Sequence, residues 1–251
     1  MAPIVTSAII FCGVFGGAIA GMLLHSVLPE HHLNAESKDV VKLGVGLVGT
    51  MAALVLGLLV ASTKGAYDTR SSELTQMAAN TILLDRTLAH YGPETAEIRA
   101  LLKLAVNRMI EQTWGTGSNE QALAASPMAN REVIYDKILE LEPRTDAQRT
   151  TQSQSESIAL TIWQAKWLLF EQNGSAISKP FLVVVVFWLT VLFASFGLFA
   201  PRNATVIVAL LVSALSVAGA IFLILELDHP FSGLIQISNA PLNNAISILG
   251  K

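Results

Sequence analysis

Charged residues are absent from four long stretches of this chain, although Asp, Glu, Lys and Arg make up 14% of the whole. The four stretches are residues 4–28, 43–62, 181–200 and 204–225, and each is dominated by apolar residues. A helix needs about 20 residues to cross the hydrocarbon core of a bilayer, and a charge at its centre costs about 2.5–3.5 kcal/mol on insertion scales. The sequence therefore predicts an all-α integral membrane protein with four transmembrane helices, and excludes an ordinary soluble domain.

Residues that carry out catalysis or bind metals are also scarce. Cys12 is the only cysteine and lies in the first apolar stretch, which excludes an internal disulfide and favours a packing role. The polar insert holds one histidine, His90, and neither a glycine-rich phosphate loop nor a Ser-His-Asp pattern. The pair His31 and His32 has no cysteine beside it, and we interpret it as loop sequence. We expect no enzymatic activity, no metal and no cofactor, and the net charge of −3 gives no reason to expect nucleic acid as a partner.

An even number of spans places the N-terminus, the insert and the C-terminus on one side of the membrane. The first stretch lacks a basic n-region, so we interpret it as a retained span rather than a cleaved signal. Basic residues near span ends are slightly more numerous on the insert side (Lys64, Arg70, Lys166 and Lys179) than on the other (Lys38, Lys42 and Arg202). The positive-inside rule then predicts a multi-pass protein of the cell membrane with both termini and the insert in the cytoplasm.

The insert reads as a set of helices. Apolar residues recur at three- and four-residue steps over 66–91, and no proline separates this stretch from the second span, which predicts one long helix that ends at Gly92-Pro93. Further helices are expected over 94–114, 126–141 and 146–172. The predicted organisation is a transmembrane hairpin (1–65), a helical cytoplasmic domain (66–178), a second hairpin (179–226) and a structured C-terminal docking segment (227–251).

Small residues form stripes in the first hairpin. The first span carries Gly13, Gly17 and Gly21 at every fourth position, and the second carries Gly49, Ala53, Gly57 and Ala61. Such stripes allow helix backbones to approach closely, so packing between helices or subunits is one interpretation. The other is that the second-span stripe faces a central ion pathway. Because no span contains an ionisable carboxylate, lysine or arginine, a passive conduit or a non-conducting anchor fits better than an ion-coupled pump.

Two junctions, after the second and the fourth span, carry motifs that resemble those of a known family of anion channels. After the second span the chain reads Ala66-Tyr67-Asp68 and then Arg70, as where the bestrophin pore helix enters the cytoplasm, although the family's tryptophan pair is absent. After the fourth span come Glu226, Asp228, Pro230, Phe231 and Gly233, followed by Ala240-Pro241-Leu242. This order is similar to the acidic residue, Pro-Phe-Gly and Leu-Pro-Leu of bestrophins, and the whole layout looks most like the bacterial bestrophin-like membrane proteins.

The resemblance implies a homopentamer around a central pore that the second span lines. The implied neck positions fall near Ala53, Gly57 and Ala61, where the family has large apolar side chains. Either the neck is wider here, or another face lines the pore, made of Leu47, Met51, Leu54 and Leu58. Calcium gating is not implied, because residues 232–245 contain no Asp or Glu.

The leading hypothesis is therefore an oligomeric channel for inorganic ions, with anions such as chloride favoured over cations. The alternative is a non-conducting membrane scaffold whose helical insert binds a cytoplasmic partner. A transporter of small molecules or lipids would need a polar pocket in mid-membrane, for which Thr50, Ser195, Thr205 and Ser213 are sparse material.

Overall fold

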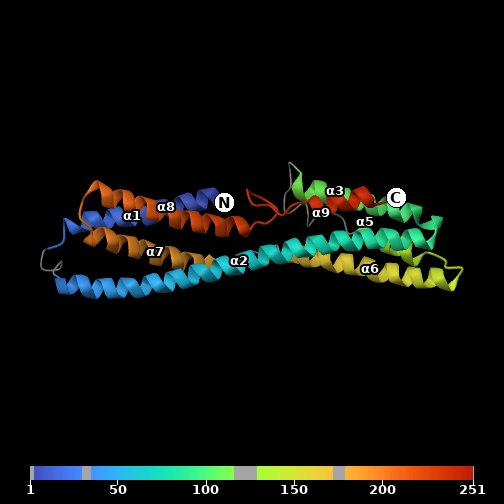
Figure 1. The fold of residues 1–251 in the computed structure, drawn as a ribbon, viewed down its shortest axis with the longest axis horizontal. Helices are drawn as coiled ribbons and strands as arrows, with labels where there is room; N and C mark the ends of the chain where they lie inside the picture. The colour runs from blue at the N-terminus through green and yellow to red at the C-terminus, as the bar shows by residue number, and fades with distance from the viewer. Residues whose placement is uncertain (1–2, 30–34, 116–128, 172–178, 251) are drawn as a thin grey trace. The chain divides into compact units, whose positions relative to one another are not determined.

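In the computed structural model every regular element is a helix, among the residues that the structure describes: 3–29, 35–115, 129–171 and 179–250 (Figure 1). This confirms the all-α prediction. The helices are α1 (Pro3–His25), α2 (Ala35–Tyr91), the short 3₁₀ helix η2 (Pro93–Thr95), α3 (Ala96–Trp114), α5 (Ala129–Leu139), α6 (Asp146–Glu171), α7 (Lys179–Phe199), α8 (Ala204–Leu227) and α9 (Ala240–Ile248).

Helix α2 is the longest element and runs without interruption for 57 residues. At about 1.5 Å per residue it is about 85 Å long, far more than the roughly 30 Å of a bilayer core. Its first residue, Ala35, precedes the charge-free stretch that starts at residue 43. The first turns of α2 therefore contain charged residues such as Lys38. It ends where expected, at Gly92, whose φ of 143° favours glycine, followed by Pro93. The prediction of one continuous helix is confirmed.

The chain divides into two compact units, and the boundary falls within α2 between Ala66 and Tyr67. The first unit comprises 1–66, 175–229 and 233–235, and the second comprises 67–174, 230–232 and 236–251. The final segment, which includes α9, thus belongs with the helical insert. Each unit has its own apolar core.

The first unit contains the four helices that are long and apolar enough to cross a membrane: α1, the N-terminal part of α2, α7 and α8. Helix α1 packs against α7 and α8 (Figure 1). The approach to α7 is close because glycines face backbone there: a Cβ at Gly21 would overlap the carbonyl oxygen of Ala194, and one at Gly197 would overlap that of Ala18. Backbone contact of this kind is the usual basis of helix packing in lipid.

Side-chain hydrogen bonds fix one end of this bundle. His25 Nδ1 donates to the carbonyl oxygen of Leu198 over 2.8 Å, and Arg202 Nη2 donates to that of Met22 over 2.5 Å. Both satisfy carbonyl groups that a helix end leaves without a partner. The Asn203 side chain caps α8 by accepting from the backbone N–H of Val206 over 2.8 Å.

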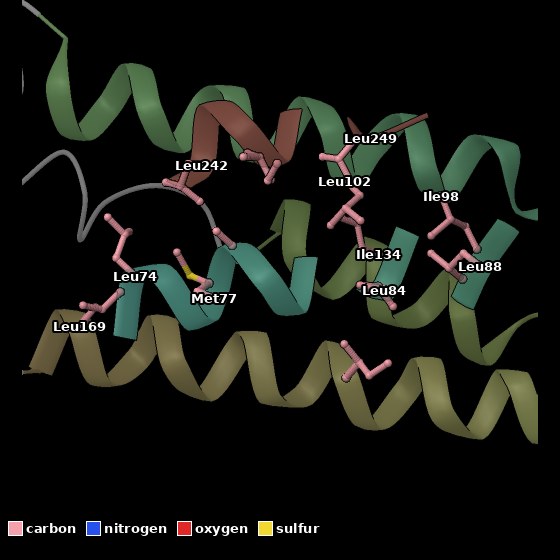
Figure 2. Packing of buried hydrophobic residues seen from close by; sticks show 14 of the residues in the cluster. Leu74, Met77, Leu84, Leu88, Ile98, Leu102, Ile134, Leu169, Leu242 and Leu249 are labelled. Carbon is pink, nitrogen blue, oxygen red and sulfur yellow. The ribbon is translucent and has the colours of Figure 1, made fainter. Parts of the chain in front are cut away.

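The second unit is a helical assembly around the C-terminal part of α2. Its helices α3, α5, α6 and α9 contribute apolar side chains to one core, as the close view in Figure 2 shows. Members labelled there include Leu74, Met77, Leu84, Leu88, Ile98, Leu102, Ile134, Leu169, Leu242 and Leu249. Helix α5 ends at Leu139, two residues before the predicted end at residue 141, and the expected N-terminal residues 126–128 lie outside the described residues.

A buried carboxylate ties the end of the chain to this unit. Asp85 of α2 is 1% exposed and accepts from Arg99 Nε and Nη2 over 2.8 and 3.0 Å. The same carboxylate accepts from the backbone N–H of Gly250 over 3.3 Å. Nearby, Lys103 Nζ donates to the carbonyl oxygen of Leu249 over 3.3 Å. The hydrogen bonds that Arg99 donates to Asp85 raise the pKa of its guanidinium above the ordinary value, so the arginine stays charged.

Candidate pore helix and junction motifs

The apolar part of α2 has little cover within its own chain. In the most apolar 18-residue stretch of α2, 6% of the residues are buried. The corresponding share is 33% in α1, 28% in α7 and 22% in α8. In the part of α2 that belongs to the first unit, the buried residues are Ala52, Leu59 and Thr63, which lie on one face of the helix. The Thr63 hydroxyl donates to the backbone carbonyl of Leu59, so this side chain adds no open polar group to the helix surface.

Most of the small-residue stripe lies on the uncovered side of α2. Ala53, Gly57 and Ala61 are exposed, and a Cβ added at Gly57 would meet nothing within 4 Å. Gly49 differs, because a Cβ there would make ordinary contact with Leu192 of α7 at 3.5 Å. The stripe therefore starts against α7 and turns away from it along the helix.

The alternative pore face is open as well. Leu47, Met51, Leu54 and Leu58 are all exposed, by 44% at Met51 to 75% at Leu54. Within one chain, both candidate faces are thus available to line a pathway or to meet another subunit.

The three glycines of the first span have different surroundings. Gly21 meets the backbone of α7, and a Cβ at Gly17 would lie 3.0 Å from the carbonyl oxygen of Thr190. Gly13 is exposed and has open space around it. Two of the three therefore lie at the contact between α1 and α7, and the third faces outward.

At the first junction, the motif residues begin the second unit. The Tyr67 hydroxyl donates to the backbone carbonyl of Gln236 over 3.3 Å. Arg70 is 3% exposed, whereas Asp68 is exposed. The tyrosine thereby links the start of the insert to the segment that precedes α9.

At the second junction, Glu226 organises a turn within the first unit. This side chain is 2% exposed, and its Oε2 accepts from the backbone N–H groups of Leu234 and Ile235 over 2.7 and 3.4 Å. Gly233 has a φ of 91°, and a Cβ there would overlap the Glu226 carboxylate. Asp228, also buried, is the C-cap of α8. A glycine is needed both for the backbone conformation and for the close approach of the carboxylate.

Pro230 and Phe231 make their contacts in the second unit. The Phe231 ring meets the Trp114 ring edge-on, with centroids 5.7 Å apart. Trp114 Nε1 donates to the carbonyl oxygen of Ile237 over 2.9 Å, and the Ile237 N–H donates to that of Pro230 over 2.8 Å. These contacts anchor the segment after α8 to the end of α3.

Sequence patterns missed the Asp85 network, although a signal was present. Asp85 follows Leu84 and lies four residues after Thr81, on the helical face that the periodicity over 66–91 predicts to be apolar. A carboxylate in such a stripe is buried only with a partner, so it could have pointed to Arg99. Within the described residues no cluster of three or more His, Cys, Asp or Glu could hold a metal ion; His31 and His32 lie outside those residues.

Comparison with known protein families decides the membership of the chain. A model of the bestrophin-like domain matches residues 12–242, a span that includes both junctions and the helical insert. The chain belongs to the bestrophin-like family. No curated protein and no solved structure matches it. The bestrophin-like family is known for channels rather than enzymes, and together with the long apolar helices this membership indicates a membrane protein.

Proposed function

We propose that this bestrophin-like protein is an oligomeric ion channel, a homopentamer in which α2 lines a central pore that conducts inorganic anions. Four spans per subunit would leave both termini and the insert in the cytoplasm, in line with the distribution of basic residues. The observation that carries the proposal is the open apolar surface of α2, the least covered of the four long apolar helices.

Lipid alone could cover that surface, since lipid tails are as apolar as leucine. The small residues Ala53, Gly57 and Ala61 argue for a helical neighbour or a pathway instead. Their short side chains leave room beside the helix, and no other described part of the chain covers them. The charge-free span excludes fixed ion-coupling groups, so conduction through it would be passive. Membership of the bestrophin-like family supports an oligomeric channel as the arrangement that would use such a surface.

The first experiment measures assembly and flux in the same preparation. We expect native mass spectrometry of purified protein to give a pentamer, and liposomes that contain it to release chloride when a potassium ionophore balances the charge. A monomer would contradict the proposal. A folded oligomer that passes no ion in several salts would favour the scaffold alternative, in which the insert binds a cytoplasmic partner.

A cysteine scan then distinguishes the two α2 faces. In a Cys12→Ser background, single cysteines are placed at Gly49, Ala53, Gly57 and Ala61, and separately at Leu47, Met51, Leu54 and Leu58. A charged thiol reagent should reduce the current at the positions that line the pore. Leu215→Cys on α8, exposed to a similar degree, is the matched control and should be insensitive. Equal effects at all nine positions would contradict a pore along α2.

A further inference from the structure

A groove of about 540 Å³ lies between α2 and α7 within the first unit. Its walls lie between Lys38 and Gly49 of α2 and between Leu192 and Phe199 of α7. At about 1.5 Å per residue the α2 wall is about 16 Å long, roughly half of the 30 Å core of a bilayer. Because Lys38 precedes the charge-free stretch that starts at residue 43, the groove begins at headgroup level and continues into the hydrocarbon of one leaflet.

The charged side chains of this groove are cations and lie at its headgroup end. Lys38 and Lys42 line the groove, and no acidic side chain does so among the residues that the structure describes. Lys38 Nζ lies 6.0 Å from the centre of the Phe199 ring, a contact that keeps its charge at the mouth of the groove. Lys42 pairs with Asp39 over 3.7 Å, but both side chains are largely exposed, so the pair is weak. An anion at the mouth therefore meets the charge of Lys38 and part of that of Lys42.

Below the lysines the walls are apolar. Gly46 of α2 contributes no side chain, whereas the Phe196 ring contributes a large apolar surface on α7. The Ser195 hydroxyl, also in the lining, donates to the backbone carbonyl of Val191 over 3.0 Å, so it offers no open donor. The bilayer core contains no water to fill such a space. An acyl chain is the apolar material that the membrane itself provides.

We propose that this groove binds one anionic phospholipid, with its phosphate at Lys38 and Lys42 and one acyl chain between α2 and α7. Basic pockets between transmembrane helices are suited to anionic headgroups, and here the apolar walls continue directly from the charged mouth. The proposal rests on the membrane location of the first unit and not on ion conduction, so it holds for a channel and for a scaffold alike.

The test uses the full-length protein in phosphatidylcholine nanodiscs that contain a small fraction of photoactivatable phosphatidylglycerol, with a diazirine in one acyl chain. Irradiation followed by peptide mass spectrometry locates the labelled residues. We expect saturable labelling of the segments 38–49 and 192–200. Unlabelled phosphatidylglycerol should compete with the probe, whereas additional phosphatidylcholine should not. Glycerol 3-phosphate at the same concentration should not compete either, because it lacks the acyl chains.

Charge and shape are tested by separate variants. Lys38→Gln should weaken labelling about fivefold, and Lys42→Gln should weaken it less, because Asp39 already offsets part of that charge. Gly46→Phe keeps both lysines but fills the groove, and should abolish labelling. Gly44→Phe is its matched control: both glycines have open space around them, but Gly44 is not in the groove lining, so labelling should remain at the parental level.

Several outcomes would overturn the proposal. Labelling spread evenly over the four long apolar helices would show ordinary contact with the bilayer, and equal competition by phosphatidylcholine would remove the role of charge. Competition by glycerol 3-phosphate would indicate a site for a free anion. Absence of labelling in both segments is expected if a second copy of the chain fills the groove instead. Equal labelling of Lys38→Gln, Gly46→Phe and the parent, in proteins with the same melting temperature, would also refute it.

Discussion

Removal of the Asp85 carboxylate should loosen the helical unit more than any single surface change. Asp85→Ala deletes three accepted hydrogen bonds, two from Arg99 and one from Gly250, at a site where the carboxylate is 1% exposed. Breaking a buried ion pair by loss of one partner costs about 3–5 kcal/mol. The Arg99 side chain is 19% exposed and regains some hydration, so we expect the lower end, about 3 kcal/mol, or roughly a 100-fold rise in local opening.

Hydrogen exchange with mass spectrometry, on protein in nanodiscs, measures this opening locally. Peptides from 74–91, 96–114 and 240–250 should lose protection together, because Asp85 joins α2, α3 and the chain end. Peptides from α7 and α8 serve as an internal reference. The assay avoids a single global unfolding energy, which a protein of two units does not define.

Two further variants make the test strict. Asp146→Ala breaks a pair with Arg149 in which the carboxylate is fully exposed, and exchange should not change measurably. In the double variant Asp85→Ala/Arg99→Met no unpaired charge remains, so part of the lost protection should return. If Asp85→Ala alters protection no more than Asp146→Ala does, the buried pair does not hold the unit together and the reasoning is wrong.

Substitutions at three other features test the remaining contacts. Gly21→Val should disrupt the contact of α1 with α7 and lower the melting temperature, whereas Gly13→Val, with open space around it, should be tolerated; equal effects would contradict the assigned contact. Glu226→Ala should cost about 1.5–3 kcal/mol through lost charge-assisted hydrogen bonds to backbone N–H groups, seen as faster exchange at 234–235. Trp114→Phe should keep the edge-on ring contact but remove the donor to the Ile237 carbonyl, for a loss of about 1 kcal/mol in local protection, measured by hydrogen exchange of the segment 230–237; a loss above that of Glu226→Ala would be unexpected.

The long helices were predictable because their signals are local. Hydropathy and the exclusion of charge need no partner to be read, so the stretches 4–28 and 204–225 agree closely with α1 and α8. The continuity of α2 followed from the absence of proline before Pro93, and its end from Gly92. Its start at Ala35 was not predicted. The span was defined as a stretch without Asp, Glu, Lys or Arg, and this criterion leaves out helical turns that contain charged residues.

Contacts between distant residues were not predictable in the same way. Gly13 and Gly21 occupy equivalent places in one stripe, and only the position of Ala194 on α7 makes them different. The return of the chain end to Asp85 joins residues 165 positions apart, a pairing that no local pattern encodes. The sequence shows that small residues form a stripe on α2, but not which way this stripe faces. Its direction depends on the position of α7.

The uninterrupted course of α2 has a consequence for how the family can vary. Each residue of a helix turns it by about 100°, so one residue inserted between Leu74 and Leu84 would rotate one of these side chains by that angle relative to the other. Both are buried in the core of the second unit, so such a change would withdraw one of them from it. The same holds in the first unit for an insertion between Ala52 and Leu59. Insertions of about seven residues, close to two full turns, would restore the phase. Within each unit the length of α2 can therefore change only in steps that return its buried face to the same core.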